Sequence, residues 1–230
     1  MSTTANNAAP LPPEPTPTDT ALSVPVLNQA GDCYLRMVFP QASGESLAEV
    51  HYRKKPTARQ LRELASAHHF YFAALQKDPD SLHALHWLAF LQLFFGMQNE
   101  ALDDAALLAM VKEKATGTPC LAELLGLYYE FREDAEKMIR WYKVAAQKNA
   151  VFAYHLARYC VDHRTHGQDA IEVLLPLKRF EDSEATCLIG LLYLHSIDVK
   201  PDRAKAKAML RLAAEHSSRE ARKTLDSLFY

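Results

Sequence analysis

The chain has 230 residues, of which 49% are hydrophobic and only 7 are glycine, and this composition favours a helical protein over a turn-rich β protein. Its 26 Lys and Arg residues against 28 Asp and Glu residues give a net charge of −2, which argues against a nucleic-acid-binding protein and against charge-driven adhesion to an anionic membrane. No apolar run approaches the roughly 18–20 residues of a membrane span, so we expect no membrane insertion.

The amino-terminal residues and the cysteines indicate the compartment. Residues 1–25 contain no Lys or Arg and no apolar core, so we expect no secretory signal. The cysteines (Cys33, Cys120, Cys160 and Cys187) form no CxxC motif, and we interpret them as reduced, small apolar side chains. These features predict a cytoplasmic protein.

Residues 1–50 are predicted to form a disordered tail. Residues 1–31 hold six of the twelve prolines, with Ser, Thr, Ala and Asn between them. Proline removes a backbone donor and fixes φ, and little in this segment could be buried to offset the entropy of ordering it. The short apolar sequence CYLRMVF at 33–39 is either a strand or a docking segment, and its pattern does not separate the two.

From residue 51 to residue 230 the pattern is helical. Thr57 and Gln60 have the spacing of a capping box, and the apolar residues after them recur every three or four positions until Pro79. A second helix is predicted from Ser81 to Phe95 with Gly96 at its end, and a third from a cap at Asn99 to Gly117. Further helices are predicted at 119–131, 134–148, 151–163, 168–179, 184–196, 203–216 and 219–229.

A repeated pattern of small residues runs through these helices. The pair Ala145-Ala146 recurs 68 residues later as Ala213-Ala214, and Gly126, Arg158 and Gly190 follow one another at intervals of 32. Two helices of a hairpin approach closely only where side chains are small. A hairpin of this kind cannot bury its apolar face alone, so neighbouring hairpins must stack.

Two segments resemble known helical repeats. Residues 73–102 resemble a tetratricopeptide repeat, in which Ala74, Pro79, Trp87-Leu88-Ala89, Gly96 and Ala101 match the usual slots. Residues 184–221 resemble a Sel1-like repeat, with matches at Ala185, Gly190, Tyr193, Asp202, Ala206, Ala213-Ala214 and Ala221. The resemblance implies an all-α fold, a right-handed α-solenoid of about four stacked helix hairpins over residues 51–230.

The sequence offers little for metal or cofactor chemistry. Cys160, His163 and His166 have a ligand-like spacing, but Cys160 falls in a helix and the two histidines fall toward a turn, so we interpret the group as a solvated turn. No GxSxG, HExxH or phosphate-binding glycine loop is present. We therefore expect no metal, no cofactor and no enzymatic activity.

The repeat arithmetic predicts which side chains line the inner, concave surface of the solenoid, where the first helix of each hairpin lies. This predicted groove combines carboxylate, aromatic and aliphatic groups, and it comprises Glu123, Leu127, Glu130, His155, Tyr159, Asp162, Cys187 and Leu191. Such a surface suits an extended or helical peptide with aromatic anchors. The alternative for Leu127, Leu191 and Leu194 is packing between helices.

The resemblance and the groove together predict a non-catalytic adaptor, scaffold or chaperone-like subunit that binds a segment of another protein. Tetratricopeptide domains that clamp a terminal carboxylate use Lys, Asn and Arg in such positions, whereas Glu123 and Glu130 oppose an anionic ligand. A basic or neutral segment is therefore the expected ligand. The sequence does not determine the oligomeric state.

Three alternatives stay open at this stage. The tail could be a secretion address, which would make the protein an exported factor. Cys187 and His155 occupy equivalent slots of adjacent first helices, so they could form a thiol–histidine nucleophile. The tail sequence SVPVLNQAG could also occupy the groove and inhibit binding.

Overall fold

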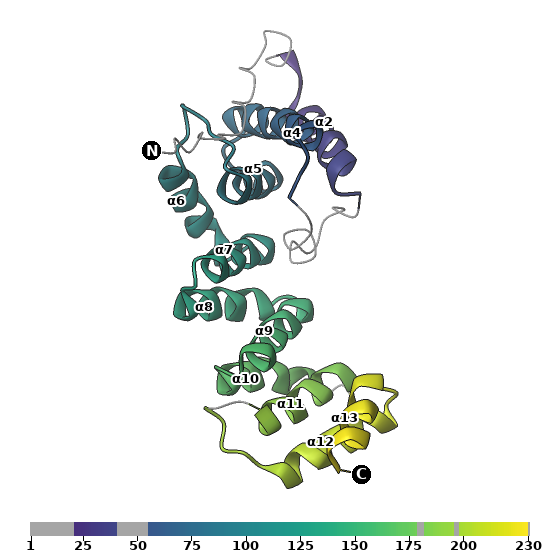
Figure 1. The fold of residues 1–230 in the computed structure, drawn as a ribbon. Helices are drawn as coiled ribbons and strands as arrows, with labels where there is room; N and C mark the ends of the chain where they lie inside the picture. Colours follow the sequence, from purple (N-terminus) through teal and green to yellow (C-terminus); the bar gives the residue numbers. More distant parts are fainter. Residues whose placement is uncertain (1–20, 41–54, 179–181, 196–197, 230) are drawn as a thin grey trace, which may run out of the picture. The chain divides into compact units, whose positions relative to one another are not determined.

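The computed structural model describes residues 21–40, 55–178, 182–195 and 198–229. Within these ranges it contains eleven α-helices and no β-strand, which confirms the all-helical class (Figure 1). The chain divides into two compact units, Met1–Arg132 and Glu133–Tyr230. None of the described helices has the length and apolar character needed to cross a membrane.

Unit 1 contains α2 (Val24–Val38), α4 (Ala58–Lys77), α5 (Leu82–Phe95), α6 (Asp104–Ala115) and α7 (Pro119–Phe131). Unit 2 contains α8 (Ala135–Ala146), α9 (Ala150–His163), α10 (Gly167–Lys178), α11 (Ser183–His195), α12 (Arg203–Glu215) and α13 (Arg219–Phe229). In both units most helices pack against the next helix in the chain, as in a succession of hairpins. In unit 2, α9 also contacts α11.

Residues 24–38 form α2, which packs along α4 (Figure 1). The prediction of disorder is therefore wrong for residues 24–32, and the strand alternative for the segment at 33–39 is wrong because residues 33–38 are helical. The buried face of α2 repeats at helical spacing through Leu27, Gly31, Leu35 and Val38. Pro25 does not prevent this helix, because a first-turn proline lacks an N–H that would in any case have no partner inside the helix. The rest of the predicted tail, at 1–20 and 41–50, lies outside the described residues.

Two of the predicted helix boundaries are confirmed and one is wrong. Thr57 Oγ1 accepts a hydrogen bond from the Gln60 backbone N–H at 3.3 Å, and Gln60 Oε1 accepts one from the Thr57 N–H at 2.9 Å, which completes the capping box. Gly96 ends α5 with a left-handed φ of 65°. The cap of α6 is Asp103 rather than Asn99, since Asp103 Oδ1 accepts from the Ala106 N–H at 2.7 Å.

The repeated small residues of unit 2 lie where helices meet. Ala145 of α8 and Ala213 of α12 are both fully buried, as are Ala185 of α11 and Ala221 of α13. A Cβ atom on Gly190 would lie 2.9 Å from Leu210 Cγ, so the close approach of α11 and α12 requires glycine at this position. This confirms that the small residues mark contact points between helices.

Asp198, in the connection between α11 and α12, caps the amino end of α10. Asp198 Oδ1 accepts from the Gly167 N–H at 2.9 Å, and its Oδ2 accepts from the Gln168 N–H at 3.3 Å. The carboxylate therefore satisfies two donors at the amino end of α10, where a negative charge also stabilises the helix dipole.

Candidate protein-binding face

One side of α9 carries three of the predicted groove residues together with an arginine. His155, Arg158, Tyr159 and Asp162 are spaced by three or four positions, which places them on the same side of the helix. Asp162 is exposed, and the other three side chains are partly exposed. We call these four residues together with Glu220 the α9–α13 face, because Glu220 of α13 meets Arg158 there.

Arg158 and Glu220 form a bidentate ion pair on this face. Arg158 Nη1 and Nη2 each donate to one carboxylate oxygen of Glu220, and both distances are 2.7 Å. The pairing raises the pKa of Arg158 and lowers the pKa of Glu220. The two side chains remain 39% and 45% exposed, so the pair is partly hydrated and contributes at most about 1 kcal/mol to stability.

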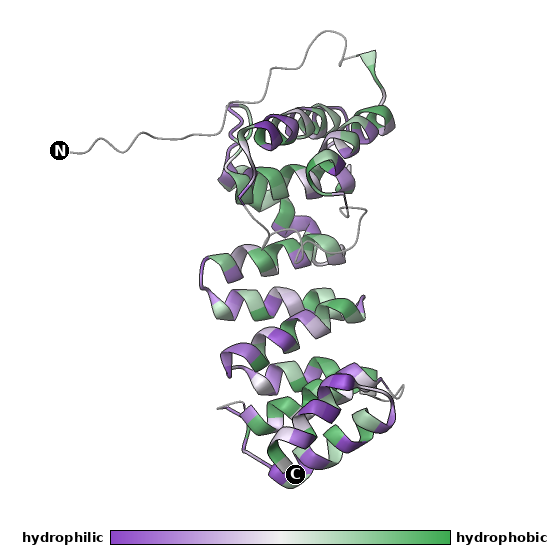
Figure 2. Ribbon diagram, turned by 45° about the vertical axis from the view of Figure 1, so that its right-hand side comes forward, coloured by the Kyte–Doolittle hydropathy of each residue, from purple (hydrophilic) through white to green (hydrophobic). Residues whose placement is uncertain are grey.

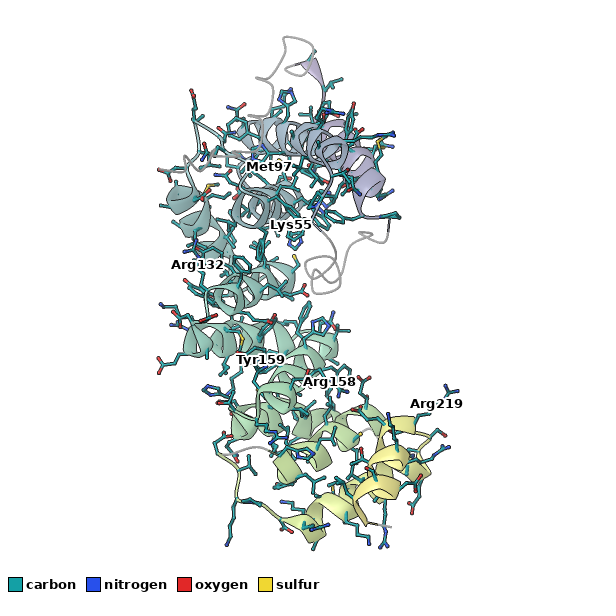
Figure 3. All side chains as sticks on the ribbon, in the orientation of Figure 1. Lys55, Met97, Arg132, Arg158, Tyr159 and Arg219 are labelled. Carbon is teal, nitrogen blue, oxygen red and sulfur yellow. The ribbon has the colours of Figure 1, made fainter. Side chains whose placement is uncertain are left out.

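Tyr159 presents an aromatic group on the same face. Its ring stacks on His163 with centroids 4.0 Å apart and an interplanar angle of 22°. His163 Nδ1 also lies 2.9 Å from the Tyr159 backbone oxygen. Figure 3 labels Tyr159 and its neighbour in the chain, Arg158. A partly exposed tyrosine is the type of side chain that anchors protein interfaces.

The predicted groove residues on α11 are not at the surface. Cys187 is 1% exposed and Leu191 is 6% exposed, so both pack between helices. For Leu191 the structure agrees with the inter-helix packing that we weighed as its alternative. Both positions are therefore corrected from surface contacts to core residues of unit 2.

The environment of Cys187 is unfavourable for a nucleophile. Burial raises the pKa of its thiol, and the Ser218 hydroxyl only partly offsets this effect. A nucleophilic cysteine needs the opposite, a lowered pKa that supplies the thiolate at neutral pH. The structure places Arg158 and Glu220, which are themselves paired, among the charged groups around this thiol.

The other predicted groove residues lie on α7 in unit 1. Glu123 and Leu127 are buried, at 0% and 1% exposure, and Glu130 is partly exposed. Leu127 thus also behaves as a packing residue. Of the three, Glu130 alone has a side chain that a partner could contact directly.

The cysteine and the two histidines with ligand-like spacing, Cys160, His163 and His166, lie in different environments. Cys160 is fully buried, and burial raises the pKa of its thiol to about 12. His163 is engaged with Tyr159, and His166 lies 3.7 Å from Asp169. Among the described residues no group of three or more His, Cys, Asp or Glu side chains could hold a metal ion.

Sequence reasoning placed Glu220 on the exposed side of the last helix, but it missed the ion pair that Glu220 forms with Arg158. Arg158 stands 32 residues after Gly126 and 32 residues before Gly190, at the position where the repeated pattern has glycine. No spacing rule predicts that Arg158 of α9 pairs with Glu220 of α13, because the two residues are 62 positions apart and α11 lies between their helices in the chain. An arginine in a small-residue slot of a repeat is nevertheless a usable signal, because its side chain has to extend away from the packed contact.

Comparison with family models, curated proteins and solved structures found no match to this chain.

Proposed function

We propose that the chain is a non-catalytic protein–protein interaction module of the cytoplasm, an adaptor or scaffold built as a right-handed α-solenoid of about four Sel1-like and tetratricopeptide-like hairpins. The all-helical fold and the buried, regularly spaced small residues support the repeat architecture. The partner is a segment of another protein that contacts the α9–α13 face.

The observation that carries this proposal is the composition of the α9–α13 face. Tyr159 supplies a partly exposed aromatic anchor that stacks on His163, and the exposed carboxylate of Asp162 and the Arg158–Glu220 pair lie on the same face. Asp162 and Glu220 outnumber Arg158, so the face has a net charge of −1 with neutral histidine. A basic or neutral segment complements this charge better than an acidic one.

Affinity capture with paired variants tests the proposal. The full chain is captured from its native cells, and bound proteins are quantified by mass spectrometry beside Tyr159→Ala and Tyr128→Ala. Tyr128 is a partly exposed tyrosine on α7 and serves as the matched control. We expect a stoichiometric partner that Tyr159→Ala loses by at least tenfold and Tyr128→Ala retains. Equal recovery with both variants would contradict the proposal, provided circular dichroism shows that both are folded.

Glu130 provides an independent test on unit 1. If the α7 surface also contacts the partner, Glu130→Ala weakens capture, whereas the α9–α13 face alone predicts no change. Either result leaves the outcome for Tyr159 decisive, because that residue carries the central contact.

A further inference from the structure

Basic residues concentrate at the carboxyl-terminal end of the chain. Residues 203–223 contain seven Lys or Arg and two Glu, a net charge of +5, whereas the whole chain carries −2, so the remaining residues carry −7. Six of the seven Lys and Arg side chains are exposed, and the seventh, Lys207, is partly exposed. Hydrophilic residues mark both helices near the carboxyl terminus in Figure 2. Such a separation of charge exceeds what solubility requires, because a mixed surface serves that purpose.

The cations of α12 form a stripe along one side of the helix. Arg203, Lys207 and Arg211 follow one another at four-residue spacing, so they share a side and span about 12 Å at 1.5 Å per residue. Two contacts tie this helix to α13. Arg203 Nη2 donates to the Leu228 carbonyl at 2.9 Å, and Arg222 Nε donates to the Ala214 carbonyl at 3.4 Å. The stripe therefore lies on a helix that is hydrogen-bonded to α13.

An apolar strip runs beside these cations. The core side of α12 is Ala206, Leu210 and Ala213, and all three are fully buried. The side that faces away from this core carries Ala204, Ala208 and Leu212, which are exposed. Lys205 borders the strip on its other flank, where its Nζ donates to the Tyr193 hydroxyl at 2.6 Å. An apolar strip with cations on both flanks matches the pattern by which paired helices recognise each other through flanking charges.

We infer that the exposed side of α12 docks an acidic amphipathic helix of a partner protein, with carboxylates on the Arg203, Lys207 and Arg211 stripe and apolar side chains on the strip that ends at Leu212. This surface is additional to the α9–α13 face and does not depend on it. Charge complementarity selects the partner, since residues 203–212 of α12 contain four Lys or Arg and no Asp or Glu, a net charge of +4 that attracts an acidic segment and repels a basic one.

The same residues are less suited to nucleic acid or membrane. Residues 203–223 contain no Phe, Tyr or Trp, so no aromatic side chain of this segment could stack on an exposed base. Membrane-surface helices insert Trp, Phe and Leu side chains, but the exposed strip of α12 offers one leucine and two alanines. An acidic protein helix uses both the small apolar strip and the cations beside it.

Fluorescence anisotropy of the full-length chain with synthetic peptides tests the inference. The probe is a labelled amphipathic helix with a leucine seam and glutamate on both flanks, and its controls are the lysine-flanked peptide and a scrambled glutamate peptide without the seam. We expect binding of the seamed acidic peptide that weakens between 50 and 300 mM salt. The lysine peptide and the scrambled peptide should bind at least tenfold more weakly.

Charge-reversal variants localise the binding. Lys207→Glu with Arg211→Glu should weaken it by about tenfold or more, and Leu212→Gln should weaken it at unchanged charge. The matched control, Arg140→Glu with Lys148→Glu, makes the same charge change at exposed positions of α8 and the turn after it, and it should bind as the wild type does.

Three results would overturn the inference. The first is equal loss with the two charge-reversed pairs, which would show non-specific attraction. The second is no binding of the acidic peptide at 50 mM salt. The third is tighter binding of single-stranded RNA or of vesicles rich in phosphatidylserine than of the peptide, which would assign the cations to a different class of partner.

Discussion

Gly31 is a residue where a single methyl group should disturb the attachment of α2 to α4. A Cβ atom at this position would lie 2.6 Å from Tyr71 Cε1 and 2.8 Å from Cζ. The Tyr71 ring cannot easily move away, because it is fully buried and its hydroxyl donates to Asp32 Oδ1 at 2.7 Å. The small residue therefore sets the distance between the two helices.

We predict that Gly31→Ala lowers the free energy of unfolding of unit 1 by about 1 kcal/mol or more. Overpacking of this kind costs about 1–3 kcal/mol, which outweighs the gain of up to about 1 kcal/mol in helix propensity. Urea unfolding followed through Trp87, in a Trp141→Phe background, measures it. The control is Gly117→Ala, where a Cβ atom meets nothing within 4 Å. An effect no larger than that of the control would show that α2 is not held closely at Gly31.

Two buried histidines make unit 1 sensitive to acid. His68 is fully buried with Nε2 3.4 Å from Gln92 Oε1, and His86 is 7% exposed. Burial lowers the pKa of each imidazole to about 4. The unfolded chain therefore binds more protons than the folded chain between about pH 6.5 and pH 4. The free energy of unfolding of unit 1 should therefore be highest above pH 6.5, where both histidines are neutral in the folded and unfolded chain, and should fall as the pH falls toward 4.

The predicted loss is up to about 3 kcal/mol for each histidine between pH 7 and pH 4. His86→Gln should remove about half of this pH dependence in unit 1, whatever its stability at pH 7. Urea unfolding at several pH values, again read through Trp87, gives the slope. His216→Gln, at an exposed position, is the control and should leave the slope unchanged. A full wild-type slope in His86→Gln would exclude this histidine as the source.

At the scale of elements, α2 is an integral part of unit 1. Leu27 and Leu35 are buried at 0% and 1% exposure, while Met37 on the same helix is 62% exposed. Leu27→Ala should therefore destabilise unit 1 by about 2–5 kcal/mol, and Met37→Ala should change stability by less than about 0.5 kcal/mol. The midpoint of urea unfolding distinguishes the two. If both variants change the free energy of unfolding by less than about 0.5 kcal/mol, the claim that α2 is an integral part of unit 1 is contradicted.

Most helices could be predicted from sequence because their ends carry local signals. The capping box at Thr57, the glycine at Gly96 and the proline of α7 act within one turn, and the predicted boundaries from 119 onward agree within two residues. The prediction failed for α2, where proline content over a long window concealed an amphipathic helix. It also failed for the cap of α6, since Asn99 and Asp103 are both good caps and only the tertiary structure selects between them.

The binding site could be predicted less well than the helices. Of the residues that repeat spacing selected, Tyr159 is partly exposed and Asp162 is exposed. Four others are buried, namely Glu123, Leu127, Cys187 and Leu191. Periodicity identifies the side of a helix and not how closely the next helix covers it. The Arg158–Glu220 pair was beyond reach because it joins helices that are not neighbours in the chain.

At the scale of the whole molecule, each unit carries one of the two tryptophans and the charge is unevenly distributed. Trp87 reports on unit 1 and Trp141 on unit 2, so one chain allows both to be followed separately. The α9–α13 face has a net charge of −1 and residues 203–212 of α12 have a net charge of +4, so the two surfaces suit partner segments of opposite charge. Under the two proposals, each surface binds its own partner segment.

The central claim is that a partner binds at the α9–α13 face, and site-specific photo-crosslinking in native cells tests it most directly. A benzophenone amino acid replaces Tyr159 in one experiment and Tyr128 in the other, and adducts are identified by mass spectrometry. The account predicts a discrete adduct with one protein from position 159 and none with that protein from position 128. No adduct from position 159, or the same adducts from both positions, would contradict it.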